Sequence, residues 1–327
     1  MKKCKNAWRK PACPNPPSHL FMKTLLEVLQ SGTEYLARQG CDEARATMQH
    51  LMAHVLHCNR TTLYSQFDRP VEEEELVPLR QLLKRKAAGE PLQHLLGTTE
   101  FFRREFLTDA RALIPRPETE ELVEMVLNRI PAHPVRILDM GTGSGIIGIT
   151  LALELKDRAR EVVLADISPK ALDLALENAM RLGARVSTIQ TDLFENLPAT
   201  PADEEWQPAE KPEQNMEETV EQLRTMQEAR FDVIVANLPY IADGEQLAPE
   251  VMRDPHTALF GGPQGWEIIE RFLSQAREHL TENGFVALEI GHDQAAAVIR
   301  IMDGYGYNHV EVLKDMSGIS RFPFAYH

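Results

Sequence analysis

The sequence has few of the features that mark secreted, membrane-spanning or nucleic-acid-coating proteins. Its 327 residues include only four cysteines, too few for a disulfide scaffold, so a reducing cytoplasm is the expected location. No apolar run approaches the roughly 18 residues of a membrane helix. The basic N-terminus is not followed by the apolar segment of a secretory signal. We therefore expect no membrane partner.

Positive charge is also scarce. The chain has 35 Lys and Arg against 49 Asp and Glu, which gives a formal net charge of −14. Proteins that coat nucleic acid need an excess of cations to neutralise phosphates. The composition therefore argues against direct nucleic-acid binding, although it leaves room for a local basic groove.

The length predicts two domains. Residues 1–19 are basic and proline-rich and are interpreted as a mobile tail. Residues 20–97 carry apolar residues at helical spacing and predict a small all-α domain. Residues 98–117 are interpreted as a β-hairpin linker that ends in a proline-stiffened loop.

Strands and helices alternate over residues 118–327, which predicts an α/β domain with a doubly wound, mostly parallel sheet. The last two strands have no helix between them and predict an antiparallel edge hairpin. The predicted strands are Arg136–Met140, Glu161–Asp166, Val186–Thr191, Phe231–Ala236, Phe285–Ile290, 309–314 and 319–325, and the predicted helices are Thr119–Asn128, Gly145–Leu155, Pro169–Leu182 and Gly265–Leu280. Residues 198–230 break this alternation. They contain four prolines and a charge of −6, and are interpreted as a solvated acidic insertion.

A glycine-rich loop follows the first predicted strand of this domain. Gly141, Gly143 and Gly145 let the backbone approach a ligand where a Cβ would clash. The spacing also matches the dinucleotide fingerprint, which alone is a weak signal. Asp139 argues against a dinucleotide, because its carboxylate would repel a pyrophosphate. It tolerates a ligand with a cationic amino acid portion, such as S-adenosylmethionine.

Acidic residues end the next two strands as well. Asp166 follows Gly141 by 25 residues and can accept both hydroxyls of a ribose. Asp192 can reach an adenine amino group, and Leu193 can pack on the ring. Acids at three successive strand ends predict a ligand site. The predicted cofactor-binding residues are Asp139, Gly141, Thr142, Gly143, Ser144, Gly145, Asp166, Asp192, Leu193 and Asn237.

The fourth strand ends in Asn237-Leu-Pro-Tyr240, a loop that suits methylation of a planar amino group. The Asn237 side-chain oxygen and the Leu238 carbonyl can each accept one hydrogen of an NH2 group and so aim its lone pair. Pro239 stiffens the loop, and Tyr240 offers a face to the substrate. The sulfonium methyl is already electrophilic, so positioning is the main catalytic task and no metal is required. These four residues are predicted to be catalytic and substrate-binding.

These motifs resemble the HemK/PrmC family of release factor glutamine N5-methyltransferases. The matching segments are Ile114–Glu120 (Ile-Pro-Arg-Pro-Glu-Thr-Glu), Asp139–Gly145, Asp166, Asp192, Asn237–Tyr240, Asp254–Gly262 with Gly265, and Asp315–Gly318 with Arg321. The resemblance implies a seven-stranded methyltransferase sheet, a helical N-terminal domain that docks the protein partner, and methyl transfer to the glutamine of the Gly-Gly-Gln motif in peptide chain release factors. Arg116 and Pro117 are expected on the substrate side.

One departure from the family keeps alternatives open. The family usually has Asn-Pro-Pro-Tyr, whereas Leu238 stands here in place of the first proline. Asn-Leu-Pro-Tyr is also similar to the motif of ribosomal RNA adenine dimethyltransferases, so an adenine-N6 methyltransferase acting on RNA or DNA is the alternative. A non-catalytic binding module with the same fold is a further hypothesis. His50, His54, His57 and Cys58 sit at helical spacing, but a second element would have to complete a metal site.

Overall fold

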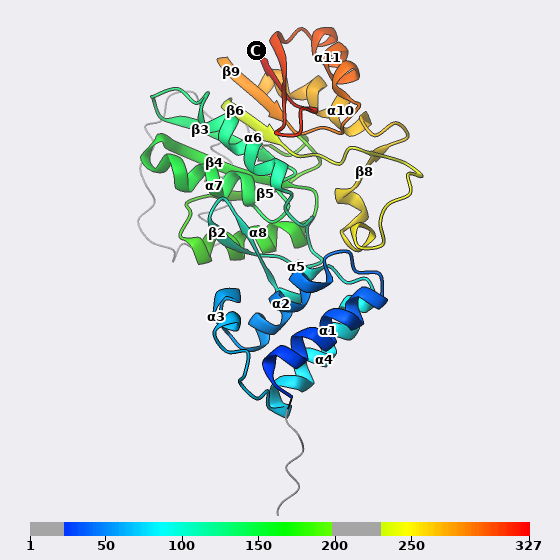
Figure 1. Cartoon of the computed structure of the whole chain (residues 1–327). Helices are drawn as coiled ribbons and strands as arrows, with labels where there is room; N and C mark the ends of the chain where they lie inside the picture. Colours follow the sequence, from blue (N-terminus) through cyan, green and yellow to red (C-terminus); the bar gives the residue numbers. More distant parts are fainter. Residues whose placement is uncertain (1–22, 198–229) are drawn as a thin grey trace, which may run out of the picture. The chain divides into compact units, whose positions relative to one another are not determined.

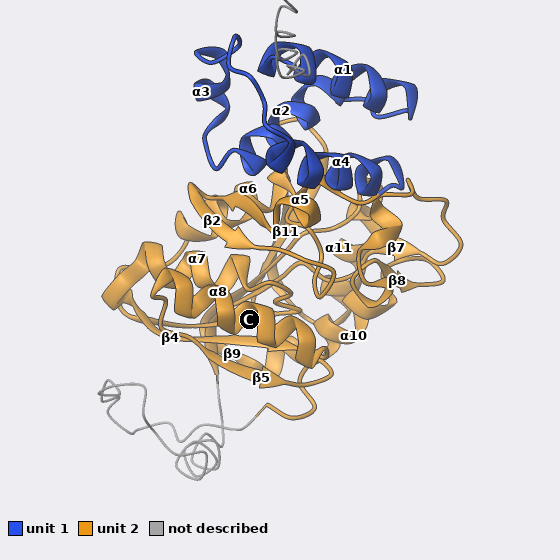
Figure 2. Ribbon diagram, turned by 90° about the horizontal axis from the view of Figure 1, so that it is seen from below, with its two compact units in different colours: residues 1–89 blue, residues 90–327 orange. Residues whose placement is uncertain are grey.

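The computed structural model describes residues 23–197 and 230–327 (Figure 1). The predicted tail lies outside these residues, and so does the predicted insertion apart from Arg230. The chain divides into two compact units, one ending at Gly89 and the other spanning Glu90–His327, coloured blue and orange in Figure 2. This division falls eight residues before the boundary suggested by the helical pattern at Gly97.

The first unit is built from helices, as its apolar spacing predicts. They are α1 (Leu25–Arg38), α2 (Ala44–Val55), α3 (Arg60–Tyr64) and α4 (Glu73–Ala87). A capping box starts α1: the Thr24 hydroxyl accepts from the Glu27 N–H, and the Glu27 carboxylate accepts from the Thr24 N–H. Leu25 and Leu36 of α1 and Met48 of α2 are fully buried, so the unit has a core of its own.

The second unit begins with a short helix, α5 (Leu92–Leu96), and a hairpin of β1 (Thr98–Phe101) and β2 (Arg104–Leu107). The hairpin is packed into this unit. Phe101 and Phe106 belong to the apolar core of the large sheet, and the Leu107 N–H donates to the side chain of Asn178 over 2.7 Å. The β-hairpin expected from the sequence is present, and its phenylalanines anchor it.

A seven-stranded sheet organises the rest of the unit, and this confirms the predicted fold class. Its strand order is β10-β11-β9-β6-β3-β4-β5, with parallel pairing from β9 to β5 and antiparallel pairing of β11 with β9 and β10. The strands are β3 (Val135–Met140), β4 (Ala159–Asp166), β5 (Ser187–Gln190), β6 (Phe231–Ala236), β9 (Leu280–Leu288), β10 (Asn308–Lys314) and β11 (Ser320–Tyr326).

Helices cover both faces of this sheet because alternate strand residues point to opposite sides. In β3, Ile137 belongs to one apolar cluster and Leu138 to the other. The first cluster includes residues of α6 (Pro117–Leu127), α7 (Ile146–Leu155) and α8 (Pro169–Leu182). The second includes residues of α10 (Glu267–Ala276) and α11 (Ala295–Gly304). The sequence analysis did not predict α11.

A small parallel pair, β7 (Ile241–Ala242) and β8 (Phe260–Gly262), lies beyond the end of β6. It joins the loop after Asn237–Tyr240 to the segment 254–262, which belongs to the motifs of the resemblance. Among the described residues, no helix combines the length and the apolar character that a membrane crossing demands.

Candidate active site

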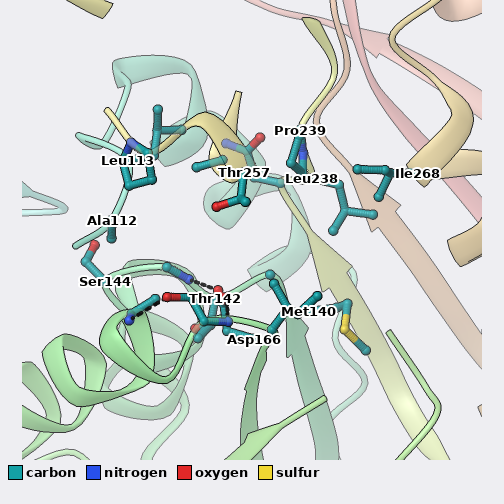
Figure 3. A pocket seen from close by; sticks show the side chains of 18 of the residues that line it. Ala112, Leu113, Met140, Thr142, Ser144, Asp166, Leu238, Pro239, Thr257 and Ile268 are labelled. Atoms are coloured by element: carbon teal, nitrogen blue, oxygen red, sulfur yellow. Dashed lines mark hydrogen bonds between the residues drawn. The ribbon is translucent and has the colours of Figure 1, made fainter. Parts of the chain in front are cut away.

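A cavity of about 340 Å³ opens at the C-terminal ends of β3, β4 and β6. Figure 3 shows Thr142, Ser144 and Asp166 on one side of it and Leu238, Pro239 and Thr257 on the other. The sequence-predicted residues that line it are Arg116, Gly141, Thr142, Gly143, Ser144, Asp166, Asp192, Leu193, Asn237, Leu238 and Pro239. Four others do not line it: Pro117, Asp139, Gly145 and Tyr240.

The glycine loop takes the conformation that its sequence indicates. Gly141, Gly143 and Gly145 have φ values of +70°, +56° and +82°, in the region that favours glycine. Gly145 also precedes α7, and a Cβ there would lie 2.6 Å from Ile149 Cδ1 and 3.0 Å from Ala175 Cβ. Gly145 therefore permits helix packing beside the cavity, whereas Gly141 and Gly143 form its wall.

Asp139 holds this loop from behind. It is completely buried, and its Oδ2 accepts hydrogen bonds from Thr142 Oγ1 (2.6 Å) and the Gly148 N–H (2.8 Å). Its Oδ1 has no hydrogen-bond partner among the described residues. Burial raises the pKa of Asp139 to about 6, against the lowering effect of these two hydrogen bonds. The carboxylate is thus a structural support with one unsatisfied acceptor.

Asp166 faces the cavity from the end of β4. Its Oδ2 accepts from the Gly143 N–H and its Oδ1 from the Ser168 N–H, both over 2.9 Å. These bonds fix the carboxylate while leaving each oxygen further acceptor capacity. Burial raises its pKa, partly offset by the backbone N–H donors. A carboxylate so held can accept two hydroxyls of a ribose.

Asp192, which follows β5, forms an ion pair that the sequence did not predict. Asp192 Oδ2 lies 3.1 Å from Arg271 Nη2, so its carboxylate already has a cationic neighbour from α10. Both residues line the cavity, and nothing in the sequence pattern pointed to Arg271. Leu193 is buried with φ of +51°, and Ile268 of α10 also lines the cavity. This side of the cavity combines apolar surface with a charged rim.

The loop after β6 is tied to distant elements. Asn237 Nδ2 donates to Thr119 Oγ1 over 3.2 Å, and the Thr119 hydroxyl donates to Glu289 Oε2 over 2.7 Å. Thr119 lies in the first turn of α6, and Glu289 directly follows β9. From the sequence, Glu289 was interpreted as a structural residue at a strand end, and Thr119 had no role of its own although it lies inside the Ile114–Glu120 string.

The segment 254–262 provides further cavity residues that the site prediction omitted: Pro255, His256, Thr257, Ala258 and Phe260. Asp254, just before them, is buried. One of its carboxylate oxygens lies 3.6 Å from Arg116 Nη2 and the other 3.9 Å from His94 Nε2. Burial raises the pKa of Asp254 to about 6, against the attraction of Arg116. The Asp254–Gly262 motif of the family resemblance is the sequence feature that could have identified this segment as part of the site.

The fold and the site together define an S-adenosylmethionine-dependent methyltransferase. The Cβ-free loop at Gly141 and Gly143 admits close backbone approach, Asp166 has free acceptor capacity for the ribose, and Leu193 offers an apolar wall. Asp139 does not line the cavity and supports the glycine loop from behind. Among the described residues, no group of three or more His, Cys, Asp or Glu side chains could hold a metal ion.

Comparison with known proteins gives the family. Residues 27–97 match the PrmC N-terminal domain, and residues 119–204 match the methyltransferase small domain. The release factor glutamine methyltransferase of Geobacter sulfurreducens is 36% identical over 91% of this chain and 95% of its own length. That of Koribacter versatilis is 35% identical over 91% and 96%. The chain belongs to the release factor glutamine methyltransferase family, which confirms the resemblance.

Among solved structures, a ribosomal protein L11 methylase from Lactobacillus delbrueckii subsp. bulgaricus aligns with a TM-score of 0.42 and 21% identity, covering 70% of this chain and 89% of that one. The names of the sequence relatives agree with the glutamine interpretation and give no support to the adenine alternative.

Proposed function

We propose that this enzyme transfers the methyl group of S-adenosylmethionine to the side-chain amide nitrogen of the glutamine in the Gly-Gly-Gln motif of peptide chain release factors. One observation carries the proposal. Asn237, Leu238 and Pro239 line the same cavity as the glycine loop and Asp166, so acceptor-holding and cofactor-holding groups face one space. The names of the relatives support the same substrate.

Bound S-adenosylmethionine supplies an electrophilic methyl group on a sulfonium. On the cofactor side, we assign Gly141–Ser144 to the backbone wall, Asp166 to the ribose hydroxyls, and Asp192 and Leu193 to the adenine end. Asp139 acts through the loop that it supports. These residues hold and orient the donor, and they take no part in proton transfer.

On the acceptor side, the Asn237 side-chain oxygen and the Leu238 carbonyl accept the two hydrogens of the substrate amide, which aims the nitrogen lone pair at the methyl group. Once the nitrogen carries the methyl group, one of these two hydrogens leaves as a proton to solvent. Tyr240 does not line the cavity, and burial raises its pKa to about 12. It therefore stays protonated at neutral pH and is not a general base. We assign Arg116, at the cavity wall, and Pro117, the first residue of α6, to the substrate side.

Leucine fits at the position where the family usually has proline. Leu238 is buried, and its Cδ2 lies 3.0 Å from the place where a Cβ on Gly141 would be. The side chain therefore packs against the glycine loop and fills the contact between the two loops. The backbone carbonyl needed for the substrate amide is retained.

We further propose residues 20–97 as the recognition domain for the release factor, 98–117 as the linker and 118–327 as the catalytic domain. A translation-termination role fits a cytoplasmic enzyme. The match of residues 27–97 to the PrmC N-terminal domain supports the first assignment.

The test is a methylation assay with the full chain and methyl-labelled S-adenosylmethionine. Three acceptors are compared: a release factor, the same factor with alanine for the motif glutamine, and RNA. Label should enter only the unmodified factor, and mass spectrometry should place one added methyl group on that glutamine. Label in RNA, or equal label in the alanine variant, would reject the proposal.

A further inference from the structure

We propose that Thr119 and Glu289 are positioning residues that fix which way the Asn237 side-chain amide points, with its nitrogen held inward and its oxygen left for the substrate. The inference rests on the proposed function, because it takes Asn237 as the acceptor of a substrate hydrogen. It adds two residues that act through Asn237 rather than on the substrate.

The geometry brings three distant parts of the chain together. Asn237 follows β6, Thr119 lies in α6 and Glu289 follows β9, and the two hydrogen bonds among them measure 3.2 and 2.7 Å. Thr119 and Glu289 are each 1% exposed, so water does not compete for these bonds. Glu289 itself is placed by its backbone, whose N–H donates to the Ala236 carbonyl beside Asn237.

The chemistry of the three groups gives the chain of hydrogen bonds one direction. An ionised carboxylate can only accept hydrogen bonds, so the Thr119 hydroxyl must donate its single proton to Glu289. The Thr119 oxygen can then only accept, and only the nitrogen of Asn237 can donate to it. The Asn237 side chain also lowers the pKa of Glu289, which favours the ionised carboxylate. A flipped amide would place its oxygen against the Thr119 oxygen, which has no proton left to donate, and this disfavours the flipped orientation strongly.

This orientation is what the acceptor role demands. A substrate NH2 group presents two donors, so it needs the oxygen of Asn237 and would be repelled by its nitrogen. In the unanchored state both amide orientations are accessible, and a part of the enzyme molecules would present the wrong group. Loss of the contacts from Thr119 and Glu289 should therefore lower the rate of methyl transfer and leave cofactor affinity unchanged.

The charge state of Glu289 sets the direction of the hydrogen bonds that link it through Thr119 to Asn237. Burial raises its pKa to about 7, while hydrogen bonds from Thr119 and Asn237 and the positive charge of Arg321 oppose the rise. Glu118 raises it further, and Glu289 in turn raises the pKa of Tyr240. Arg321 is held in turn by Asp315, its Nε lying 2.9 Å from Asp315 Oδ2.

Protonation of Glu289 removes the directional constraint, because a carboxylic acid can donate to Thr119 and release the Asn237 amide to flip. Activity should therefore fall as the pH drops through the pKa of Glu289. The deprotonated form, which dominates above that pKa, is the active one.

The first test compares Thr119→Val, which keeps the side-chain shape but lacks the hydroxyl, with the wild type, Thr119→Ser and Thr150→Val. Thr150 is a matched control, because it is fully buried in α7 and its hydroxyl has no hydrogen-bond partner among the described residues. We expect kcat to fall about tenfold or more in Thr119→Val, with the cofactor KM within about twofold. Thr119→Ser keeps the hydroxyl and should keep kcat near the wild-type value. Thr150→Val should also keep the wild-type kcat.

The second test follows kcat against pH. The wild type should lose activity on the acidic side of a single transition, and Glu289→Gln should lose this transition because the amide does not titrate there. Glu118→Gln should move it to lower pH, since the Glu118 charge favours protonation of Glu289. A structural role alone would alter thermal stability without changing the pH profile.

The outcomes separate the two proposals. Wild-type enzyme that fails to label the release factor overturns the proposed function. Wild-type labelling together with an unchanged kcat in Thr119→Val overturns the positioning role alone. So does an acidic transition that persists in Glu289→Gln.

Discussion

The two halves of the cavity are held in different ways. In the cofactor half, Asp139 bonds residues three and nine positions away, and Asp166 bonds Gly143, 23 positions away. In the acceptor half, Asn237 bonds Thr119 across 118 positions, and Thr119 bonds Glu289 across 170. The glycine-loop side of the cofactor half is one strand-loop-helix unit and its neighbouring strand, whereas the acceptor half exists only when the whole sheet is assembled.

This difference has a consequence for function. Substitutions in the cofactor half should appear mainly in the cofactor Kd, and substitutions in the acceptor half mainly in kcat. Each of the following variants tests this division. A cofactor-half variant that changed mainly kcat, or an acceptor-half variant that changed mainly the cofactor Kd, would contradict it.

The largest effect is expected for Asn237→Ala. It removes the side-chain oxygen assigned to the substrate amide, and loss of one such pre-organised group costs about 10²- to 10³-fold in kcat. Single-turnover transfer to a release factor measures it. Asn283→Ala, which removes an exposed asparagine in β9, is the matched control and should keep full activity. An Asn237→Ala enzyme with normal kcat would contradict the assignment.

Asp166→Ala comes next, and it acts on the other half. The substitution removes the acceptor for the ribose hydroxyls and the anchor of the Gly143 N–H. We expect the Kd for S-adenosylhomocysteine to rise about 10- to 100-fold, as for loss of hydrogen bonds to a charged group. Isothermal titration calorimetry measures the change. Asp173→Ala, at an exposed position of α8, should leave the Kd unchanged.

The same contrast explains what could be predicted from the sequence. Asp139, the three glycines and Asp166 follow strands along the chain, so their meeting at one sheet edge could be deduced from the alternation of strands and helices. The hydrogen bonds of Thr119 and Glu289 could not, because no periodicity encodes a contact across 170 residues. Arg271 was missed for the same reason, since it looks like any polar residue of an amphipathic helix until α10 packs beside β5.

A smaller effect is expected for Gly261→Ala in β8. A Cβ there would lie 2.4 Å from the carbonyl oxygens of both Pro239 and Gly265, so the backbone beside the acceptor loop must shift. A misplacement of this kind should lower kcat several-fold while the cofactor Kd stays near the wild-type value. Gly304→Ala is the control, because no atom lies within 4 Å of the new Cβ. A changed Kd with normal kcat would contradict the division of the cavity.

The smallest effect concerns stability, at the buried carboxylate of the acceptor half. Asp254 has a folded-state pKa of about 6 against an ordinary value of 3.8. Because this pKa is higher in the folded state, the neutral carboxyl stabilises the folded protein fully at a pH below the ordinary pKa of 3.8. That contribution is lost as the pH rises through about 6. The ionised group then disfavours the folded state. Asp254→Asn should therefore raise the Tm by a few degrees at pH 8.

The pH dependence of that gain is the decisive measurement. The difference in Tm between Asp254→Asn and the wild type should shrink below pH 6 and vanish near pH 4, where both proteins carry a neutral group. Asp315→Asn gives the opposite sign, because hydrogen bonds from the Ile319 N–H and Arg321 lower the pKa of Asp315. That variant should be less stable than the wild type at pH 8. A loss of stability in Asp254→Asn at pH 8 would mean that the attraction between Asp254 and Arg116 outweighs the burial of the charge.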